Sequence, residues 1–264
     1  DFEFIIINDG STDKSLEIIE KYKEQDERIT LISRENKGLI SSLNEGITRS
    51  KGEYIARMDA DDISAPTRFQ KQIEQIEIEG ADICGSHYHV INDNGKLIDH
   101  ILTPLNNNSL ILYLIFSVPF AHGATLIRRQ FLLDNKLEYG QGYIYAEDKY
   151  LWIQIYNLNG KFTNVNDSLF YYREISESKS RVQAKELYQD VKNMKIDFIK
   201  NNYNSVNTSF EIMSKGFRGL SGLEQEHLLD LAFILGIKKI SILKKASIRQ
   251  VVISILKFIQ KIFK

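Results

Sequence analysis

The chain has 264 residues, of which 43% are hydrophobic, 11% aromatic and 26% charged. This composition is typical of a globular protein and excludes disordered, collagen-like and disulfide-rich chains, because apolar residues are abundant and Cys84 is the single cysteine. The sequence shows no uncharged apolar run long enough to span a bilayer and no recognisable leader peptide, and a lone thiol fits a reducing compartment. We therefore expect a cytoplasmic protein.

The formal net charge of −1 conceals two parts of opposite sign. Residues 237–264 carry eight basic side chains and no acidic one. Residues 1–236 carry 26 basic and 35 acidic side chains, a balance of −9. An acidic body with a basic, isoleucine-rich tail indicates two different surroundings for the two parts.

Short apolar runs alternate with helical periodicity along the first half of the chain. We expect strands at 4–7, 29–32, 53–58 and 123–128, helices near 16–23, 39–49, 106–115 and 147–158, and a hairpin of 87–91 with 96–102. A further helix opens at Pro66 and is expected to place Phe69, Ile73 and Ile76 on one face. Such alternation predicts an α/β fold with a mostly parallel sheet and helices on both faces.

Beyond Arg173 the periodicity is almost entirely helical. We expect three units: a catalytic α/β domain at 1–175, a helical extension at 176–236 and a basic amphipathic tail at 237–264. In the extension, Leu187, Val191, Met194 and Phe198 share one helical face, which we expect to pack on the domain.

Acidic side chains gather where two of the expected strands end. Asp9 closes the first strand, and Asp59, Asp61 and Asp62 follow the third. Ligands of parallel sheets bind beyond the carboxyl ends of strands, and crowded carboxylates there favour a hard cation that shares phosphate oxygens. A metal–diphosphate site is one interpretation, and capping of the next helix by Asp61 or Asp62 is the other. A calcium loop is excluded, because its sixth and twelfth positions require Gly and Glu, and the sequence has Ser and Gln there.

Several short motifs in a fixed order favour the metal–diphosphate site over helix capping. The segments are Ile-Asn-Asp-Gly-Ser-Thr-Asp at 7–13, Asn-Lys-Gly-Leu at 36–39, Asn-x-Gly-Ile at 44–47, the run 52–62 that ends in Asp-Ala-Asp-Asp, and Pro-x-Arg at 66–68. This series resembles the nucleotide-sugar-binding half of family 2 glycosyltransferases, which have the GT-A (Rossmann-like) fold. The resemblance extends from the first residue to about Arg173.

The resemblance implies a role for each matching residue. Asp9 would accept a hydrogen bond from the nucleotide base, Asp59 would face the ribose and diphosphate, and Asp61 with Asp59 would hold a divalent metal, Mn²⁺ or Mg²⁺. Asp62 would support the site or cap the next helix. Residues expected to line the nucleotide pocket are Lys37, Gly38 and Asn44. Arg57 is equally well explained as a surface strand residue and is given no role.

A second matching segment is Tyr-Ala-Glu-Asp-Lys at 145–149, which resembles the family's acceptor-side motif. Inverting sugar transfer needs one general base to take the proton of the acceptor hydroxyl, while a metal stabilises the departing diphosphate. We assign Asp148 as this base, and we expect Glu147 to position either Asp148 or the acceptor. Acids in a first helical turn are also stabilised by the helix dipole alone. His122 would touch donor sugar or acceptor, or would be an ordinary core histidine.

The resemblance also shows departures. The family begins with a strand and helix ahead of the segment that matches the first residue here, so we expect that this unit is lacking. Ile175 stands where many relatives have His, and the Gln-x-x-Arg-Trp motif of processive synthases is absent, which favours the addition of a single sugar.

Taken together, the motifs predict an inverting glycosyltransferase that moves a hexosyl or N-acetylhexosaminyl group. The donor would be a nucleotide sugar, in particular a UDP-sugar, and the acceptor a glycan or lipid-linked glycan in bacterial surface polysaccharide or lipooligosaccharide synthesis. A non-catalytic nucleotide-sugar-binding or membrane-docking module is the alternative. A nucleotidyltransferase would need a Gly- and basic-rich triphosphate loop, which the sequence does not show.

The tail has the pattern of an interfacial helix. On a helical projection, its basic side chains fall opposite an apolar half made of Ile248, Val251, Val252, Ile255, Leu256, Phe258, Ile259, Ile262 and Phe263. We expect the tail to lie on an anionic membrane, which would make the protein peripheral on the inner face of the cell membrane. Docking on the acidic body is the alternative. Nucleic acid is not an expected partner, because the tail offers no aromatic stacking platform.

Deletion of the tail tests the membrane interpretation. The full chain is expected to float with vesicles that contain anionic lipid, and the chain that ends at residue 236 is expected to remain at the bottom of the gradient. Each basic side chain near such a surface contributes about 1 kcal/mol, so raised salt should also release the full chain. Equal flotation of both proteins would contradict the membrane interpretation.

Overall fold

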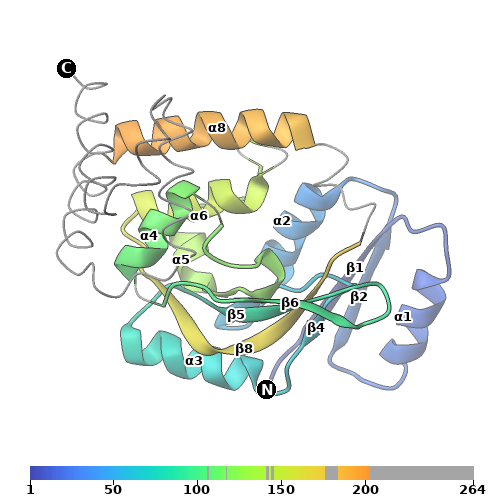
Figure 1. The fold of residues 1–264 in the computed structure, drawn as a ribbon. Helices are drawn as coiled ribbons and strands as arrows, with labels where there is room; N and C mark the ends of the chain where they lie inside the picture. The colour runs from blue at the N-terminus through green and yellow to red at the C-terminus, as the bar shows by residue number, and fades with distance from the viewer. Residues whose placement is uncertain (106, 117, 141–142, 144–145, 176–183, 203–264) are drawn as a thin grey trace.

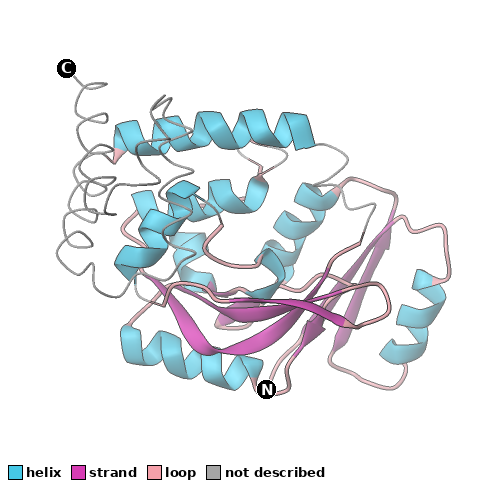
Figure 2. Cartoon of the chain, in the orientation of Figure 1, coloured by secondary structure: helices cyan, strands magenta, loops and turns pink. Residues whose placement is uncertain are grey.

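A computed structural model describes residues 1–105, 107–116, 118–140, 143, 146–175 and 184–202. It shows β-strands covered on both sides by helices (Figures 1 and 2). Of the expected extension, the described part is α8 (Ala184–Asn201) with the residue that follows it, and the tail at 237–264 lies outside the described residues.

The chain begins with a small parallel sheet. Strand β1 (Phe4–Asp9) pairs in register with β2 (Ile29–Arg34), and helix α1 (Ser15–Lys23) connects them. Helix α2 (Leu39–Arg49) follows β2 and contacts β1. All these elements lie where the sequence predicts them. Within the described residues β1 pairs with β2 alone, and the expectation that a preceding strand and helix are lacking stays a prediction.

The larger sheet has six strands in the order β3-β7-β5-β8-β4, with β6 paired to the other part of β5. They are β3 (Tyr54–Ala56), β4 (Ile63–Ser64), β5 (Ile83–Ile91), β6 (Leu97–Ile101), β7 (Leu126–Arg128) and β8 (Phe162–Arg173). The long β5–β8 pair is parallel, and the other described pairs of this sheet are antiparallel. The α/β class is therefore confirmed, with a mixed sheet around a parallel centre.

Two differences from the expected elements affect the site. The expected strand at 123–128 is divided into a 3₁₀ turn η1 (His122–Ala124) and the short β7, which places His122 in a turn. Strand β8 is absent from the expected elements, although it is the longest strand described. It brings Arg173 beside β4 and the acidic loop.

Hydrophobic cores form on both faces of the larger sheet, because successive strand residues point to opposite sides. On β5, Ile83 joins the core beneath α4 (Asn107–Phe116), α5 (Arg129–Asp134) and α6 (Glu147–Asn157). Its neighbour Cys84 joins the opposite core beneath α3 (Arg68–Glu79). In Figure 1, α3 lies on one side of the sheet and α4, α5 and α6 lie on the other.

The buried face of α3 differs from the expected one. Arg68, Gln72 and Ile76 are buried, whereas Ile73 is 36% exposed. Of the three residues predicted to share one face, Ile76 is buried, Phe69 is half-buried and Ile73 is exposed. The polar pair is buried because its side chains bind main-chain carbonyls of the sheet and the adjoining turns.

Helix α8 packs against α6 and the core of the larger sheet, as expected for the first part of the extension. Met194 and Phe198 are each 2% exposed and belong to the core that also holds Trp152. The ring of Phe198 lies 5.2 Å from that of Tyr156 on α6. Figure 1 shows α8 above α6, on the side away from the sheet. The side chain of Leu187 lies outside the described residues.

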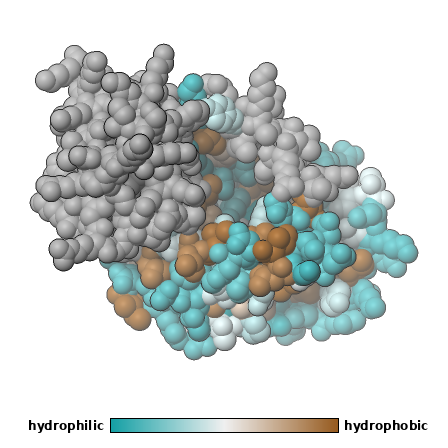
Figure 3. All heavy atoms as spheres, viewed as in Figure 1, coloured by the Kyte–Doolittle hydropathy of each residue, from teal (hydrophilic) through white to brown (hydrophobic). Residues whose placement is uncertain are grey.

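Hydrophobic and hydrophilic side chains are mixed on the face shown in Figure 3. The exposed apolar residues include Leu97, Ile98 and Leu102, which belong to β6 or follow it directly. Among the described helices, none combines the length and the apolar character needed to cross a bilayer.

Two glycine substitutions test the packing around the sheet. A Cβ at Gly85 on β5 would lie 2.4 Å from Asn164 Oδ1 and 2.5 Å from Phe120 Cδ1, so Gly85→Ala is expected to lower the free energy of unfolding by about 1–3 kcal/mol. A Cβ at Gly46 within α2 would meet Ile7 at an ordinary 3.8 Å, so Gly46→Ala is expected to raise it by about 0.4–1 kcal/mol. Denaturant unfolding measures both changes. Equal effects of the two substitutions would contradict this packing.

Candidate active site

The first group of predicted residues meets at the end of β1. The carboxylate of Asp9 accepts hydrogen bonds from the main-chain N–H groups of Lys37 (2.9 Å) and Gly38 (2.8 Å) and pairs with Arg34. Burial raises the pKa of Asp9, but the two N–H groups and Arg34 outweigh it, so the pKa is lowered. Gly38 has a φ of 87° at the start of α2, a conformation that favours glycine. Asp9 therefore holds the turn that opens α2.

Asn44 connects this region to a distant segment. Its side-chain amide donates to the carbonyl of Tyr139 (3.1 Å), and its oxygen accepts from the N–H of Tyr139 (2.8 Å). The two hydrogen bonds join α2 to the segment before α6. Both ends of the Asn44 amide thus have a protein partner, and the predicted contact of Asn44 with a nucleotide stays a prediction.

The second group follows β3. Arg57 forms a two-point ion pair with Asp59, one guanidinium nitrogen to each carboxylate oxygen. The side chain of Arg57 is 9% exposed, and that of Asp59 is 35% exposed. A cation thus sits inside the acidic cluster that the sequence analysis assigned to metal and diphosphate.

Arg173 fixes the rest of the acidic loop from the end of β8. Its main-chain N–H donates to Asp62 Oδ1 (2.8 Å), and its guanidinium donates to the carbonyl of Asp61 (2.7 Å). The same side chain donates to the carbonyls of Asn92 (2.8 Å) and Asp93 (3.0 Å) in the β5–β6 turn. Arg173 therefore ties the acidic loop to that turn.

Asp62 is buried between this loop and the sheet. Burial raises its pKa to about 7, and the neighbouring Asp59 and Asp61 act in the same direction. Its Oδ2 has no hydrogen-bond partner among the described residues. The capping alternative for Asp61 or Asp62 was wrong, because α3 begins after Thr67 with no side-chain cap and Asp62 binds Arg173 instead.

These carboxylates fit a cation that takes few protein ligands. The Asp61 side chain is exposed, and no hydrogen bond or ion pair joins its carboxylate to another described residue. The described residues include no cluster of three or more His, Cys, Asp or Glu side chains able to hold a metal by themselves. Mg²⁺-like cations are commonly held by one or two carboxylates together with substrate phosphates and water. Asp59 and Asp61 match this kind of shared site.

The third group opens α6. Glu147 and Asp148 are its first two residues, and Asp148 Oδ1 accepts the N–H of Lys149 (2.6 Å). Burial raises the pKa of both carboxyls, and the charge of Asp148 adds to the effect on Glu147. A raised pKa makes the deprotonated form of each group a stronger base than an exposed carboxylate.

His122 contacts Tyr139 and Trp152, and Trp152 belongs to α6. Its Nε2 is 3.0 Å from the Tyr139 hydroxyl, and its ring lies edge-on to Trp152 at 5.9 Å. Burial lowers the pKa of His122 well below its usual value, and the charge of Arg57 acts in the same direction. His122 is therefore neutral near pH 7.

The second and third groups are electrostatically coupled. The charges of Arg57 and Asp59 both act on Glu147 and on Tyr139. Three contributors to the site were not predicted from the sequence: Arg57, Tyr139 and Arg173. Arg57 was set aside as a strand residue, Arg173 was visible as the end of the resemblance, and no sequence signal pointed to Tyr139.

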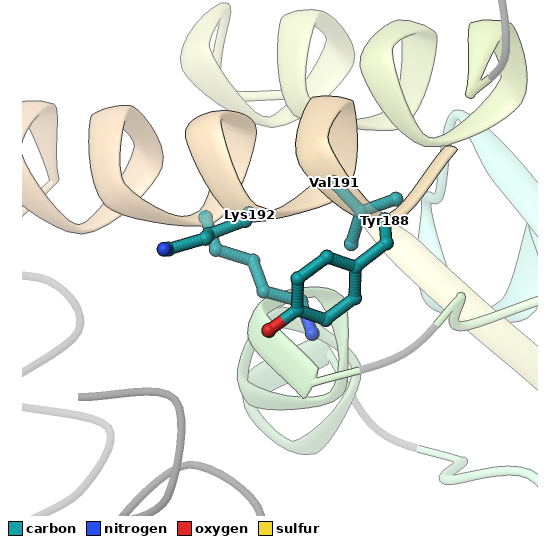
Figure 4. A pocket seen from close by; sticks show the side chains of 4 residues that line it. Tyr188, Val191 and Lys192 are labelled. Carbon is teal, nitrogen blue, oxygen red and sulfur yellow. The ribbon is translucent and has the colours of Figure 1, made fainter. Parts of the chain in front are cut away.

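A small pocket is formed by residues outside these three groups. It is lined by Tyr188, Val191, Lys192 and Lys195, all on α8 (Figure 4). None of the predicted site residues lines it. One lining residue, Lys195, is close enough to the first turn of α6 for its charge to act on Lys149.

The chain is similar in sequence to known glycosyltransferases. The family model "Glycosyl transferase family 2" matches residues 1–136. The O-antigen biosynthesis glycosyltransferase WbnJ of Escherichia coli is 31% identical over 184 residues, which cover 69% of this chain and 71% of WbnJ.

Two solved structures show the same fold. S. aureus TarS 1–349, solved with UDP-GlcNAc, has a TM-score of 0.62 at 18% identity and covers 99% of this chain and 82% of its own. The mannosyltransferase PcManGT of Pyrobaculum calidifontis, solved with GDP-Man and Mn²⁺, has a TM-score of 0.55 at 13% identity and covers 96% and 76%. The order of motifs, the GT-A fold and these matches together show that this chain belongs to glycosyl transferase family 2.

Proposed function

We propose that this chain transfers a sugar from a nucleotide-sugar donor, in particular a UDP-sugar, to a glycan or lipid-linked acceptor, with inversion and with a divalent cation. The proposal depends on one observation, the presence of two sets of carboxylates with different surroundings. One set, Asp59 and Asp61, follows β3 and suits a cation. The other, Glu147 and Asp148, opens α6 with raised pKa values.

The donor side of the site is assigned to the strand ends. Asp61 and Asp59 would hold Mn²⁺ or Mg²⁺, which supplies positive charge to the departing diphosphate. Asp9 with the Lys37–Gly38 turn would meet the nucleotide base, and Asn44 keeps α2 in place below it. Main-chain N–H groups of the turn are already organised by Asp9, so little ordering is required when a nucleotide binds.

The acceptor side is assigned to α6. Asp148 takes the proton of the acceptor hydroxyl while the hydroxyl oxygen bonds to the anomeric carbon, opposite to the carbon–oxygen bond that breaks. The electron pair of that bond stays on the diphosphate. Glu147 adds negative charge beside Asp148 and positions the acceptor. Neutral His122, bonded to Tyr139, orients donor sugar or acceptor and is not required as an acid.

Several finer assignments rest on the relatives and on the tail. A bacterial surface-glycan role is supported by the similarity to an O-antigen glycosyltransferase. Transfer of a hexosyl or N-acetylhexosaminyl group is supported by neighbours solved with UDP-GlcNAc or GDP-Man. Peripheral attachment to the inner face of the membrane depends on residues 237–264, through an amphipathic pattern and eight basic side chains.

A screen of nucleotide sugars tests the proposal. The full chain is incubated with UDP-, GDP- and CDP-sugars and Mn²⁺, and hydrolysis or transfer is followed by release of the nucleoside diphosphate. Asp148→Asn is expected to lower kcat at least about a hundredfold, since general base catalysis contributes about 10²–10⁴. Asp61→Ala is also expected to lower kcat, because it removes a ligand of the cation that would offset the charge of the departing diphosphate. The matched control is Asp167→Asn. Asp167 is an exposed carboxylate that pairs with Lys71, and its replacement should leave full activity.

Two outcomes would contradict parts of this proposal. Nucleotide binding by the full chain without turnover of any sugar would favour the non-catalytic binding module. Full activity of Asp148→Asn would remove Asp148 as the base.

The pH profile gives a further readout of the same assignment. A carboxyl whose pKa is raised must lose its proton before it can act as a base, so kcat is expected to fall as pH drops through a value above the ordinary aspartate range. This acid limb should be missing from the residual activity of Asp148→Asn. An acid limb that persists unchanged in that variant would assign the titration to another group.

A further inference from the structure

Arg57 is the cationic side chain at the centre of the candidate site. It leaves the end of β3, is 9% exposed and holds both oxygens of Asp59. Its charge acts on Glu147, Asp148 and His122 as well. An arginine with no role at the end of an edge strand would be exposed to solvent. Arg57 is instead close to charged or polar residues of the loop after β3, of η1 and of the start of α6.

The main chain of Arg57 is held by two hydrogen bonds. Its carbonyl accepts a hydrogen bond from buried Arg68 (3.0 Å), and its N–H donates to the carbonyl of Thr125 (3.1 Å). The backbone is therefore held on both sides. The guanidinium has further N–H groups, and no described residue other than Asp59 takes a hydrogen bond from the side chain.

The proposed reaction creates a negative charge that a protein cation such as Arg57 could stabilise. When the bond between the sugar and the diphosphate breaks, the electron pair stays on the phosphate oxygen, and the leaving group gains one negative charge relative to the donor. Asp59 and Asp61 would hold one divalent cation, whose charge would balance that of the intact sugar diphosphate but not the additional charge of the leaving group. A guanidinium donates two parallel hydrogen bonds to phosphate oxygens and supplies the missing positive charge.

We infer that Arg57 is a diphosphate-binding residue of this site, which holds Asp59 when no nucleotide is bound and donates to the phosphate oxygens of a nucleoside diphosphate when one is bound. The inference rests on the proposed function, because it requires the donor diphosphate to lie beside Asp59. It adds a protein cation to the divalent metal at the leaving group. It also makes Arg57 a competitor of the metal for Asp59 in the absence of nucleotide.

The two roles predict effects of opposite sign when Arg57 is replaced. Titration calorimetry is used with UDP and GDP in the presence of Mn²⁺, and separately with Mn²⁺ alone. Arg57→Met is expected to weaken binding of the nucleoside diphosphate at least about tenfold. The same variant is expected to bind Mn²⁺ alone as tightly as the parent or more tightly, because the competing cation is gone. Arg57→Lys keeps the positive charge but lacks the planar guanidinium. Its affinity for the nucleoside diphosphate should lie between that of the parent and that of Arg57→Met.

A matched control is available in the same chain. Arg28 forms the same two-point pair with Asp26, two residues away, on an exposed turn far from the site in sequence. Arg28→Met should leave both nucleotide and Mn²⁺ binding unchanged. Thermal unfolding of each variant, measured in parallel, separates loss of the fold from loss of binding.

Each outcome decides one of the two proposals. If the parent binds neither UDP nor GDP, the proposed function fails and this inference fails with it. If the parent binds and Arg57→Met binds the nucleoside diphosphate equally well, the inference alone fails. Weaker binding of both nucleotide and Mn²⁺ in Arg57→Met would show a structural role for Arg57 and would also overturn the inference. If Arg57→Met does not fold, the same comparison in Arg57→Lys decides.

Discussion

The geometry of the candidate site depends on two buried polar side chains of α3. Arg68 donates to the carbonyls of Arg57 and Thr125, and Gln72 donates to those of Cys84 and Ala124. A hydrogen bond from Arg68 to Gln72 (3.0 Å) joins the pair. Burial lowers the pKa of Arg68 to about 9, which shows the cost of placing a charge there. The hydrogen bonds of Arg68 offset this cost, because each buried carbonyl left without a donor would be unfavourable by about 1–3 kcal/mol.

This anchoring explains why segments distant in sequence can form one site. The end of β3 carries the acidic loop, and η1 carries His122. Because α3 binds carbonyls at both places, their relative position does not depend on flexible surface contacts. Arg173 closes the loop from the opposite side through Asp61 and Asp62. The loop is thus held at both ends, while the Asp61 carboxylate stays exposed for a ligand.

Much of this arrangement could be predicted from the sequence, and the limits have physical reasons. The apolar runs and helical periods located β1, β2, α2 and α6 closely, because burial and local propensity agree there. The long β8 was missed, since polar residues interrupt its apolar pattern at Asn164, Asn166 and Asp167. The acidic positions were predicted from their spacing and resemblance. Their partners were not. Arg173 is 111 positions from Asp62 and reaches it only when β8 pairs with β4. Arg57 is only two positions from Asp59, but a strand residue can also face solvent, so the sequence did not assign it to the site.

The double hydrogen bond between Asn44 and Tyr139 has a mechanical consequence. It joins residues 95 positions apart, one on the helix that begins at the Asp9 turn and the other on the segment that leads to α6. A rotation of that helix must carry the Tyr139 segment with it or break both bonds. The Tyr139 hydroxyl is bonded to His122 in turn. Tyr139 therefore connects α2 with the turn that carries His122, through its main chain on one side and its hydroxyl on the other.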